Sequence, residues 1–282
     1  MFSVSGISID RWAVLALAVS VVLAVWGVLS ATGVSDYVRD SFTHRIGEPE
    51  VTWAVDELDP DDPPDVRFAV AGDVGTGSDI EYRTAEVVSD RSGFQAFDGL
   101  ILLGDNVYPS GDPARLRDTV FEPFADVLAA GTSLLPVLGN HDVRDGNREG
   151  QVAALDMPGP WYEKRFGDAH FFGLDSTRST DLQQREWFES AISSSEASWK
   201  IVAMHHPPYS SGRRGSDALI RKLYVPLFAA HGIQLVLAGH SHDYQRSQVI
   251  DGVTYVVSGA AARKREWERK ISQRRRGPRT TS

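Results

Sequence analysis

The segment IQLVLAGHSH, residues 233–242, joins an apolar run to a polar loop that holds two histidines. The run contains no charged residue, which is typical of a strand that is buried on both faces of an α/β sheet. The loop that follows contains His240 and His242, whose imidazoles are common metal ligands. A buried strand that ends in such a loop predicts a functional site at the carboxyl edge of the sheet.

Six further apolar runs of the same kind occur in the chain. They are VRFAVA (66–71), GLILL (99–103), SLLPVL (133–138), HFFGL (170–174), WKIVAM (199–204) and VTYVVSG (253–259). Helical patterns lie between several of them, namely TAEVVSD, RLRDTVFEPFADVLAA, QQREWFESAIS and DALIRKLYVPLFAAHG. Apolar strands that are separated by amphipathic helices indicate an α/β sheet covered on both faces.

Polar motifs stand directly after five of the runs. They are AGDVG, GDNVY, GNHD, HHPPY and GHSH, and they contain five of the eight histidines of the chain. Each motif alone has an ordinary structural explanation, because Asp73 could cap a helix and Asp105 could form an Asx turn. The His205–His206 pair could equally stand in a loop without any function. Since the carboxyl ends of strands meet at one edge, the coincidence of all five predicts one shared site.

The chain has no cysteine, so histidine, carboxylate, amide or phenolate ligands would have to hold any metal ion. Such ligands suit iron, manganese and zinc. Two ions about 3.5–4 Å apart can clamp the attacking and leaving oxygens of a phosphoryl transfer and activate water. The chain contains no GxSxG elbow and no GxxxxGK[ST] loop, which are the sequence signs of acyl transfer and of nucleotide-driven chemistry.

The five motifs in this order resemble those of the calcineurin-like metallophosphoesterases. In detail they are similar to the purple acid phosphatases, the branch that includes the tartrate-resistant acid phosphatases, whose blocks run GDxG, GDxxY, GNH(D/E), VxxH and GHxH. This chain carries the corresponding residues at 72–75, 104–108, 139–142, 202–205 and 239–242. The resemblance implies an α/β fold, in the form of an α+β sandwich, in which two β-sheets pack face to face between flanking helices.

The resemblance also implies a role for each polar residue. The residues implied to bind a first metal ion are Asp73, Tyr108 and His242. Those implied to bind a second ion are Asn140, His205 and His240, with Asp105 bridging the two. Two residues are implied to act on the substrate. His141 would contact the phosphate or protonate the leaving group, and Asp142 would orient His141. His206 would either line the phosphate pocket or only flank a ligand.

One departure from the wider superfamily concerns the first ion. Gly75 stands where that superfamily usually has a histidine ligand, and Tyr108 lies three residues after Asp105. A phenolate is a hard anionic donor that favours a trivalent ion. The two changes together predict Fe(III) in the first position and a divalent ion, zinc, manganese or Fe(II), in the second.

The implied activity is hydrolysis of phosphate monoesters by in-line attack of a hydroxide bound to the two-metal centre, without a phosphoenzyme. The substrates would be small phosphorylated molecules, selected by the loops at 109–114, 143–162 and 209–216. Two alternatives stay open. One is a phosphodiesterase or nucleotidase that uses the same metals, and the other is a non-catalytic membrane-anchored surface protein that retains the fold.

The predicted catalytic domain spans residues 65–262, and the segments before it have a different character. Residues 1–35 contain an uncharged apolar stretch, 12–34, which is long enough to span a bilayer core of about 30 Å. A cleaved signal peptide is the alternative interpretation of that stretch. Residues 36–64 end in DELDPDDPPD, an acidic and proline-rich linker. We expect a membrane-anchored or secreted protein with an extracytoplasmic catalytic domain.

Charge is distributed unevenly along the chain. The net charge is −9, residues 1–45 are neutral and the tail 263–282 carries +7, so residues 46–262 carry −16. A body this acidic would repel a polyanion, which argues against a nucleic-acid partner. The tail has no apolar strand pattern, although the second sheet of the family normally takes strands from beyond the GHxH motif. It is a solvated tail, the sign of missing last strands, or a contact for a membrane surface or anionic partner.

Overall fold

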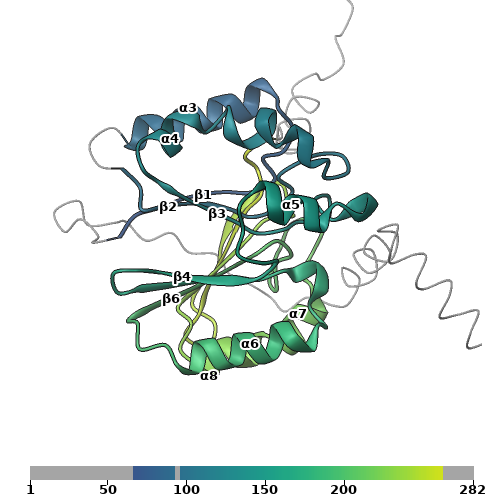
Figure 1. Ribbon diagram of the computed structural model, residues 1–282. Coiled ribbons are helices and arrows are strands. Elements are labelled where there is room, and N and C mark those ends of the chain that lie inside the picture. Colours follow the sequence, from purple (N-terminus) through teal and green to yellow (C-terminus); the bar gives the residue numbers. More distant parts are fainter. Residues whose placement is uncertain (1–65, 93–95, 263–282) are drawn as a thin grey trace, which may run out of the picture.

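The structure is a computed structural model that describes residues 66–92 and 96–262. In this part of the chain nine strands form two sheets, which pack face to face between two layers of helices (Figure 1). The smaller sheet is parallel, in the order β1-β2-β3, and consists of β1 (Phe68–Ala71), β2 (Gly99–Leu102) and β3 (Ser133–Pro136). The larger sheet has the order β4-β5-β6-β7-β9-β8.

The larger sheet is parallel in its centre and antiparallel at both edges. Its strands are β4 (Tyr162–Phe166), β5 (Ala169–Gly173), β6 (Trp199–Met204), β7 (Leu235–Ala238), β8 (Tyr244–Arg246) and β9 (Thr254–Ser258). The pairs β4–β5 and β8–β9 run antiparallel, and the other pairs run parallel. The two sheets confirm the fold implied by the family resemblance, whereas the pattern of runs alone indicates a single sheet between helices.

All seven apolar runs form strands, and the two strands that the sequence did not indicate are the edge strands β4 and β8. The sequence of β4 is YEKRF, with three successive exposed side chains, and β8 has only three residues. An edge strand pairs on one side only and carries charge, so it lacks the apolar run that marks a buried strand.

The helices differ from the expected ones where proline interrupts them. The expected helix over 115–130 is divided into η1 (Pro113–Arg115), the π-helical turn η2 (Arg117–Phe121) and α4 (Ala125–Ala129), and Pro123 lies between the last two. The expected helix over 217–232 is divided into α7 (Ala218–Leu223) and α8 (Val225–Ala230), with Pro226 in the first turn of α8. Proline has no N–H to donate and its ring displaces the preceding turn.

Of the remaining helices, two were predicted from the sequence and three have no signal in it. The patterns within 84–90 and 183–193 belong to α3 (Asp79–Ser92) and α6 (Leu182–Ser193). The helix α5 (Arg148–Ala154) and the short helices η3 (Arg144–Gly146) and η4 (Ser176–Arg178) have no apolar periodicity in the sequence. Figure 1 shows α3 and α4 over the smaller sheet and α6, α7 and α8 over the larger one.

Alternate side chains of the larger sheet belong to two different cores. Phe171 and Ile201 join the core between the sheets, whereas their neighbours Phe172 and Val202 join the core beneath α6, α7 and α8. Successive side chains of a strand point to opposite faces, so this sheet buries apolar side chains on both. That is why its strands read as uninterrupted apolar runs.

Within residues 66–92 and 96–262, no helix combines the length and the apolar character that a bilayer crossing requires. The predicted membrane segment at 12–34, the acidic linker and the basic tail all lie outside the described residues.

The first helix carries a buried carboxylate that holds the loop before it. Glu81 on α3 is fully buried, and its Oε2 accepts hydrogen bonds from the backbone N–H of Thr76 (2.9 Å) and of Gly77 (2.6 Å). Burial raises the pKa of Glu81 to about 7, although these hydrogen bonds act in the opposite direction.

We expect Glu81 to lower the folding stability as the pH rises from 4.5 to about 7. Between these values the folded state holds a proton that the unfolded state has lost, so stability falls with pH, and above about 7 the full penalty remains. Glu81→Gln keeps an acceptor oxygen and cannot ionise, so its melting temperature should decline less than that of the wild type between pH 5 and pH 8. Glu86→Gln, at an exposed position of the same helix, is the control, and equal slopes in all three proteins would contradict the prediction.

Candidate metal centre

The seven residues predicted to bind metal ions lie in five loops, each of which follows a strand. Asp73 follows β1, Asp105 and Tyr108 follow β2, Asn140 follows β3, His205 follows β6, and His240 and His242 follow β7. The strands belong to both sheets, and the loops meet where the carboxyl edges of the two sheets come together. The structure brings all seven side chains into one continuous group.

One part of the group is formed by Asp73, Tyr108 and His242. The hydroxyl of Tyr108 donates a hydrogen bond to Oδ1 of Asp73 over 3.0 Å, and Nε2 of His242 lies 3.2 Å from the same oxygen. The tyrosine oxygen and Nε2 of His242 are 3.5 Å apart. These three residues are the set implied for the first metal ion.

The second part is formed by Asn140, His205 and His240. Oδ1 of Asn140 lies 3.1 Å from Nε2 of His205 and 3.2 Å from Nδ1 of His240, and the two histidine nitrogens are 3.1 Å apart. Three potential ligand atoms therefore face one another. They are the atoms of the set implied for the second metal ion.

Asp105 connects the two parts. Its Oδ1 lies 3.4 Å from Nε2 of His205 and accepts a hydrogen bond from the backbone N–H of His141 over 2.8 Å. Ligand atoms of Asp73, Asp105 and His205 lie within 4.8 Å of one another, as do those of His205, His206 and His240. Two overlapping groups of buried donors are the arrangement that a pair of neighbouring ions requires.

The imidazole of His205 is oriented by the backbone. Its Nδ1 lies 2.7 Å from the carbonyl oxygen of Leu103, which can only accept, so Nδ1 carries the proton. The lone pair of Nε2 is then directed at Asp105 and Asn140. A hydrogen bond from the remote ring nitrogen to a carbonyl is the usual way in which a metal-binding histidine is held.

Three of the seven residues have a left-handed backbone. The φ angles are 60° at Asp73, 54° at Asp105 and 68° at His240. Such conformations cost about 1–3 kcal/mol each and persist only where the surroundings enforce them. Their concentration in one cluster indicates that the loops are shaped for the direction of these side chains rather than for local stability.

Gly75 explains why a tyrosine, and not a histidine, completes the first set. A Cβ at Gly75 would lie 2.3 Å from the backbone carbon of Asn106 and from the backbone nitrogen of Val107. The two loops are also joined by a hydrogen bond from the N–H of Tyr108 to the carbonyl of Gly75, 2.7 Å long. No side chain fits at position 75 while the loop of Tyr108 lies in this place.

The electrostatics of the group favour a cation. Asp73 and Asp105 are almost fully buried. Burial would lower the pKa of His205, but Asp105 and Asp73 outweigh it and raise that pKa above its usual value. Burial would likewise raise the pKa of Asp105, but His205 and His141 lower it. Because buried carboxylates need a compensating positive charge, this set of oxygen and nitrogen donors fits metal ions.

His141 lies at the open side of the group. Its side chain is 15% exposed, its Nδ1 lies 2.6 Å from the carbonyl oxygen of Pro109, and its ring packs on Tyr108. Its Nε2 is 3.9 Å from Oδ2 of Asp105 and so faces the group. The Pro109 carbonyl, which holds the ring, had no signal in the sequence.

Asp142 has contacts that differ from the expected ones. Its buried carboxylate accepts hydrogen bonds from the backbone N–H groups of Val107 (3.0 Å) and Gly139 (2.8 Å) and from the amide of Asn106 (3.0 Å). Burial, together with the nearby charge of Asp105, raises the pKa of Asp142 to about 7. These hydrogen bonds tie two loops together, and it is Pro109 that orients His141.

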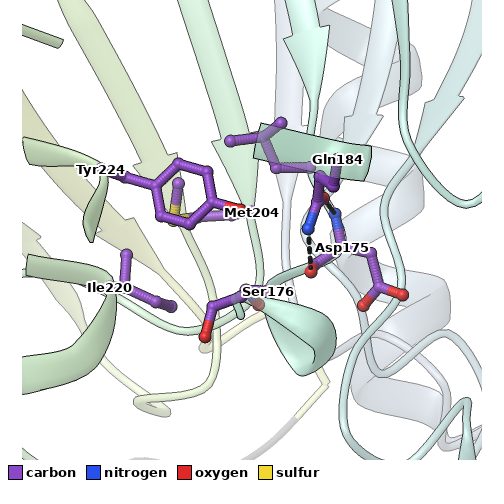
Figure 2. A pocket seen from close by; sticks show the side chains of 8 residues that line it. Asp175, Ser176, Gln184, Met204, Ile220 and Tyr224 are labelled. Atoms are coloured by element: carbon purple, nitrogen blue, oxygen red, sulfur yellow. Dashed lines mark hydrogen bonds between the residues drawn. The ribbon is translucent and has the colours of Figure 1, made fainter. Parts of the chain in front are cut away.

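His206 is buried beside the second set. Its ring centroid is 4.7 Å from that of His240, and its Nδ1 lies 2.8 Å from the hydroxyl of Ser176, a residue that the sequence did not single out. Ser176 also lines a small pocket that contains none of the predicted site residues. Figure 2 shows the residues that line this pocket and labels Asp175, Ser176, Gln184, Met204, Ile220 and Tyr224.

The pocket of Figure 2 supports the segment that carries Ser176. The amide of Gln184 donates to the carbonyl of Asp175 over 3.1 Å, and the backbone N–H of Asp175 donates to Oε1 of Gln184 over 2.7 Å. These bonds attach the start of η4 to α6. We therefore assign the pocket to packing behind His206 and not to a separate site.

Comparison with known families agrees with this geometry. A model of the calcineurin-like phosphoesterase family matches residues 66–244. The tartrate-resistant acid phosphatase type 5 of Rattus norvegicus is 28% identical over 236 residues, which cover 69% of this chain and 72% of that protein. Purple acid phosphatase 17 of Arabidopsis thaliana is 24% identical over 233 residues, covering 70% and 69%.

Two solved structures share the fold at low sequence identity. GAP50, described as the anchor in the inner membrane complex of Plasmodium, superposes with a TM-score of 0.61 at 18% identity and covers 70% of this chain and 72% of that one. A dimetal phosphatase from Danio rerio gives a TM-score of 0.52 at 16% identity, over 71% and 89%. These two similarities concern the fold alone.

We expect divalent metal ions to stabilise the folded protein. A ligand present at about 100 times its dissociation constant should raise the melting temperature by about 5–10 °C, and EDTA should reverse the change. Asp105→Asn should lose most of this rise, because it removes the charge shared by both sets. Thermal melts with and without zinc or manganese measure the effect. Asp118→Asn, at an exposed position of η2 that belongs to neither ligand set, should keep the full rise, and an equal rise in both variants would contradict the assignment.

Proposed function

The chain belongs to the calcineurin-like phosphoesterase family and is a hydrolase of phosphoester bonds, and from that premise we propose that it cleaves phosphate monoesters at a two-metal centre. The observation that supports the proposal is the convergence of seven oxygen and nitrogen donors from five loops, six of them on buried residues and the seventh on the half-buried His242. The acid phosphatases among its relatives support the choice of monoesters.

The two sets described above would each hold one ion. Asp73, Tyr108 and His242 would hold the first, Asn140, His205 and His240 the second, and the carboxylate of Asp105 would contact both. Two bound ions would neutralise charge on the phosphate and lower the pKa of a water molecule, which supplies the nucleophile. This division is supported by the short distances within each set and by the position of Asp105 between them.

The residues of the chain have their own part in the reaction. His141 is partly exposed, and its Nε2 faces the group without belonging to either ligand set, so this nitrogen would donate a hydrogen bond to the phosphate or a proton to the leaving oxygen. The Pro109 carbonyl would hold this ring in place through Nδ1. His206, held by Ser176, would complete the wall of the phosphate pocket next to His240.

We propose Fe(III) for the first ion and zinc, manganese or Fe(II) for the second. The support is the hydroxyl of Tyr108, which points at Asp73 and His242 and would act as a phenolate ligand. A phenolate suits a trivalent ion better than a divalent one. The similarity to a plant purple acid phosphatase supports the same choice.

Two other functions are compatible with the same fold. A phosphodiesterase or nucleotidase would use the same donors, and only the loops around the centre would distinguish it. A non-catalytic role is compatible with the fold, since one structural neighbour is described as an anchor. That role is not favoured here, because each of the seven ligand positions holds a side chain able to bind a metal.

The metal-loaded protein should hydrolyse p-nitrophenyl phosphate. Asp105→Asn and His240→Ala should lower kcat/KM by at least about 100-fold, because each removes a ligand. His141→Ala should lower kcat by about 100-fold or more while the metal content stays that of the wild type, as expected for a proton donor. His231→Ala, at the residue that follows α8 and outside both ligand sets, is the histidine control. No turnover of mono- or diesters by fully loaded wild type would refute the proposal.

The identity of the first ion can be read from the visible spectrum. Iron-replete protein should be purple, because a phenolate bound to Fe(III) absorbs visible light, and Tyr108→Phe should lose this colour. Iron content measured in the same samples separates loss of the phenolate from loss of the metal. Colourless wild-type protein that contains stoichiometric iron would count against a tyrosinate–Fe(III) site.

A further inference from the structure

We propose that Arg214, together with Nε2 of His240, binds a second anionic group of the substrate beside the phosphate that is hydrolysed. This inference rests on the proposed function, because it assigns a substrate class to the same site. The second group would be another phosphate, as in a diphosphate, or a carboxylate on the leaving group.

Arg214 belongs to the loop 209–216, which is held against the loop that carries His240. Oγ of Ser210 lies 3.2 Å from Oγ of Ser241, and the backbone N–H of Ser211 donates to Oε1 of Gln245 over 2.8 Å. Nε2 of Gln245 donates in turn to Oγ of Ser210 over 3.1 Å. The loop is therefore connected to the GHSH motif itself and to β8, the strand that follows it.

The loop is also packed as closely as its backbone allows. A Cβ at Gly212 would lie 2.7 Å from Nε2 of Gln245 and 2.9 Å from Oγ of Ser241. The loop is closed by a hydrogen bond from the N–H of Ser210 to Oγ of Ser216, 2.9 Å long. Arg214 thus starts from a well-defined backbone position, which reduces the entropy lost when its side chain binds a ligand.

The orientation of His240 connects Arg214 to the metal centre. Nδ1 of His240 faces Asn140 and His205, whereas its Nε2 lies 3.4 Å from a guanidinium nitrogen of Arg214. When Nδ1 binds a metal, the proton of the neutral imidazole sits on Nε2. The guanidinium has only donors. Two donors then lie side by side, and an anionic oxygen placed between them accepts from both.

The loop that carries Arg214 is basic, although the carboxylate of Asp243 lies beside its Gly212. The loop YSSGRRGS contains two arginines and no acidic residue, although residues 46–262 as a whole carry −16. The guanidinium fork of Arg214 matches the oxygens of phosphate and carboxylate groups. Because Arg214 is partly exposed whereas His240 is buried, it would contact a part of the substrate beyond the reacting phosphate. Its effect would be on substrate choice.

The alternative is that Arg214 only holds the ring of His240. Loss of the arginine would then disturb the metal site and weaken the binding of every phosphate ligand to the same extent. A second-anion site instead predicts a loss that is confined to ligands with two anionic groups. The comparison of one-anion and two-anion ligands therefore separates the two roles.

Calorimetric titration of the metal-loaded full-length protein tests the proposal without turnover. The probes are methylphosphonate, which has one anionic group, and methylenediphosphonate and phosphonoacetate, which add a phosphonate and a carboxylate. Wild type should bind at least one two-anion probe about tenfold or more tighter than methylphosphonate. Arg214→Ala should remove most of this advantage and change methylphosphonate binding less than about threefold. Which probe gains affinity shows whether the second group is a phosphate or a carboxylate.

The control is Arg213→Ala, which removes the same charge from the exposed neighbouring position and should leave the advantage intact. Metal content is measured after each titration, because diphosphonates can extract metal ions. Equal weakening of all probes in Arg214→Ala, or the same loss in Arg213→Ala, would overturn the proposal. If the protein hydrolyses a monoester but binds the two-anion probes no more tightly than methylphosphonate, this inference alone is rejected. If the two-anion probes bind more tightly in an Arg214-dependent way but no ester is hydrolysed, the proposed function alone is rejected.

Discussion

Two buried carboxylates organise the carboxyl edge of this protein. Asp73 accepts hydrogen bonds from Tyr108 and from the backbone of His240, and Asp105 accepts one from the backbone of His141. These bonds connect loops from both sheets across large distances in the sequence. Buried charges of one sign are unfavourable unless a cation compensates them, so the same interactions that join the loops also create the demand for metal ions.

Much of the fold could be predicted from the sequence, because its central strands are buried on both faces and therefore read as plain apolar runs. The edge strands β4 and β8 could not, since one is charged and the other has three residues. Pro123 and Pro226 mark the breaks of the two divided helices in the sequence. The apolar periodicity nevertheless continues on either side of each proline, so periodicity alone predicts one helix where the chain forms two or more.

The candidate site was predictable to a similar degree and for a related reason. Its seven donors stand in short motifs after strands, and the topology brings such motifs together. The supporting residues carry no such mark. The Pro109 carbonyl beside His141, the hydroxyl of Ser176 beside His206 and the guanidinium of Arg214 beside His240 act through contacts between segments far apart in the chain. Only the tertiary structure shows these contacts. It also shows that the carboxylate of Asp142 joins two loops.

The close approach at Gly75 has a consequence for how such a site can change during evolution. Any side chain at that position would collide with the backbone at Asn106 and Val107, so a histidine could appear there only if the loop of Tyr108 moved as well. A histidine at position 75 is therefore not tolerated until the loop has changed. The two positions are epistatic, and a lineage that has adopted the tyrosine cannot regain the histidine by a substitution at position 75 alone. Gly75 and Tyr108 would then be inherited together, and the metal preference of the site would change only when both positions change.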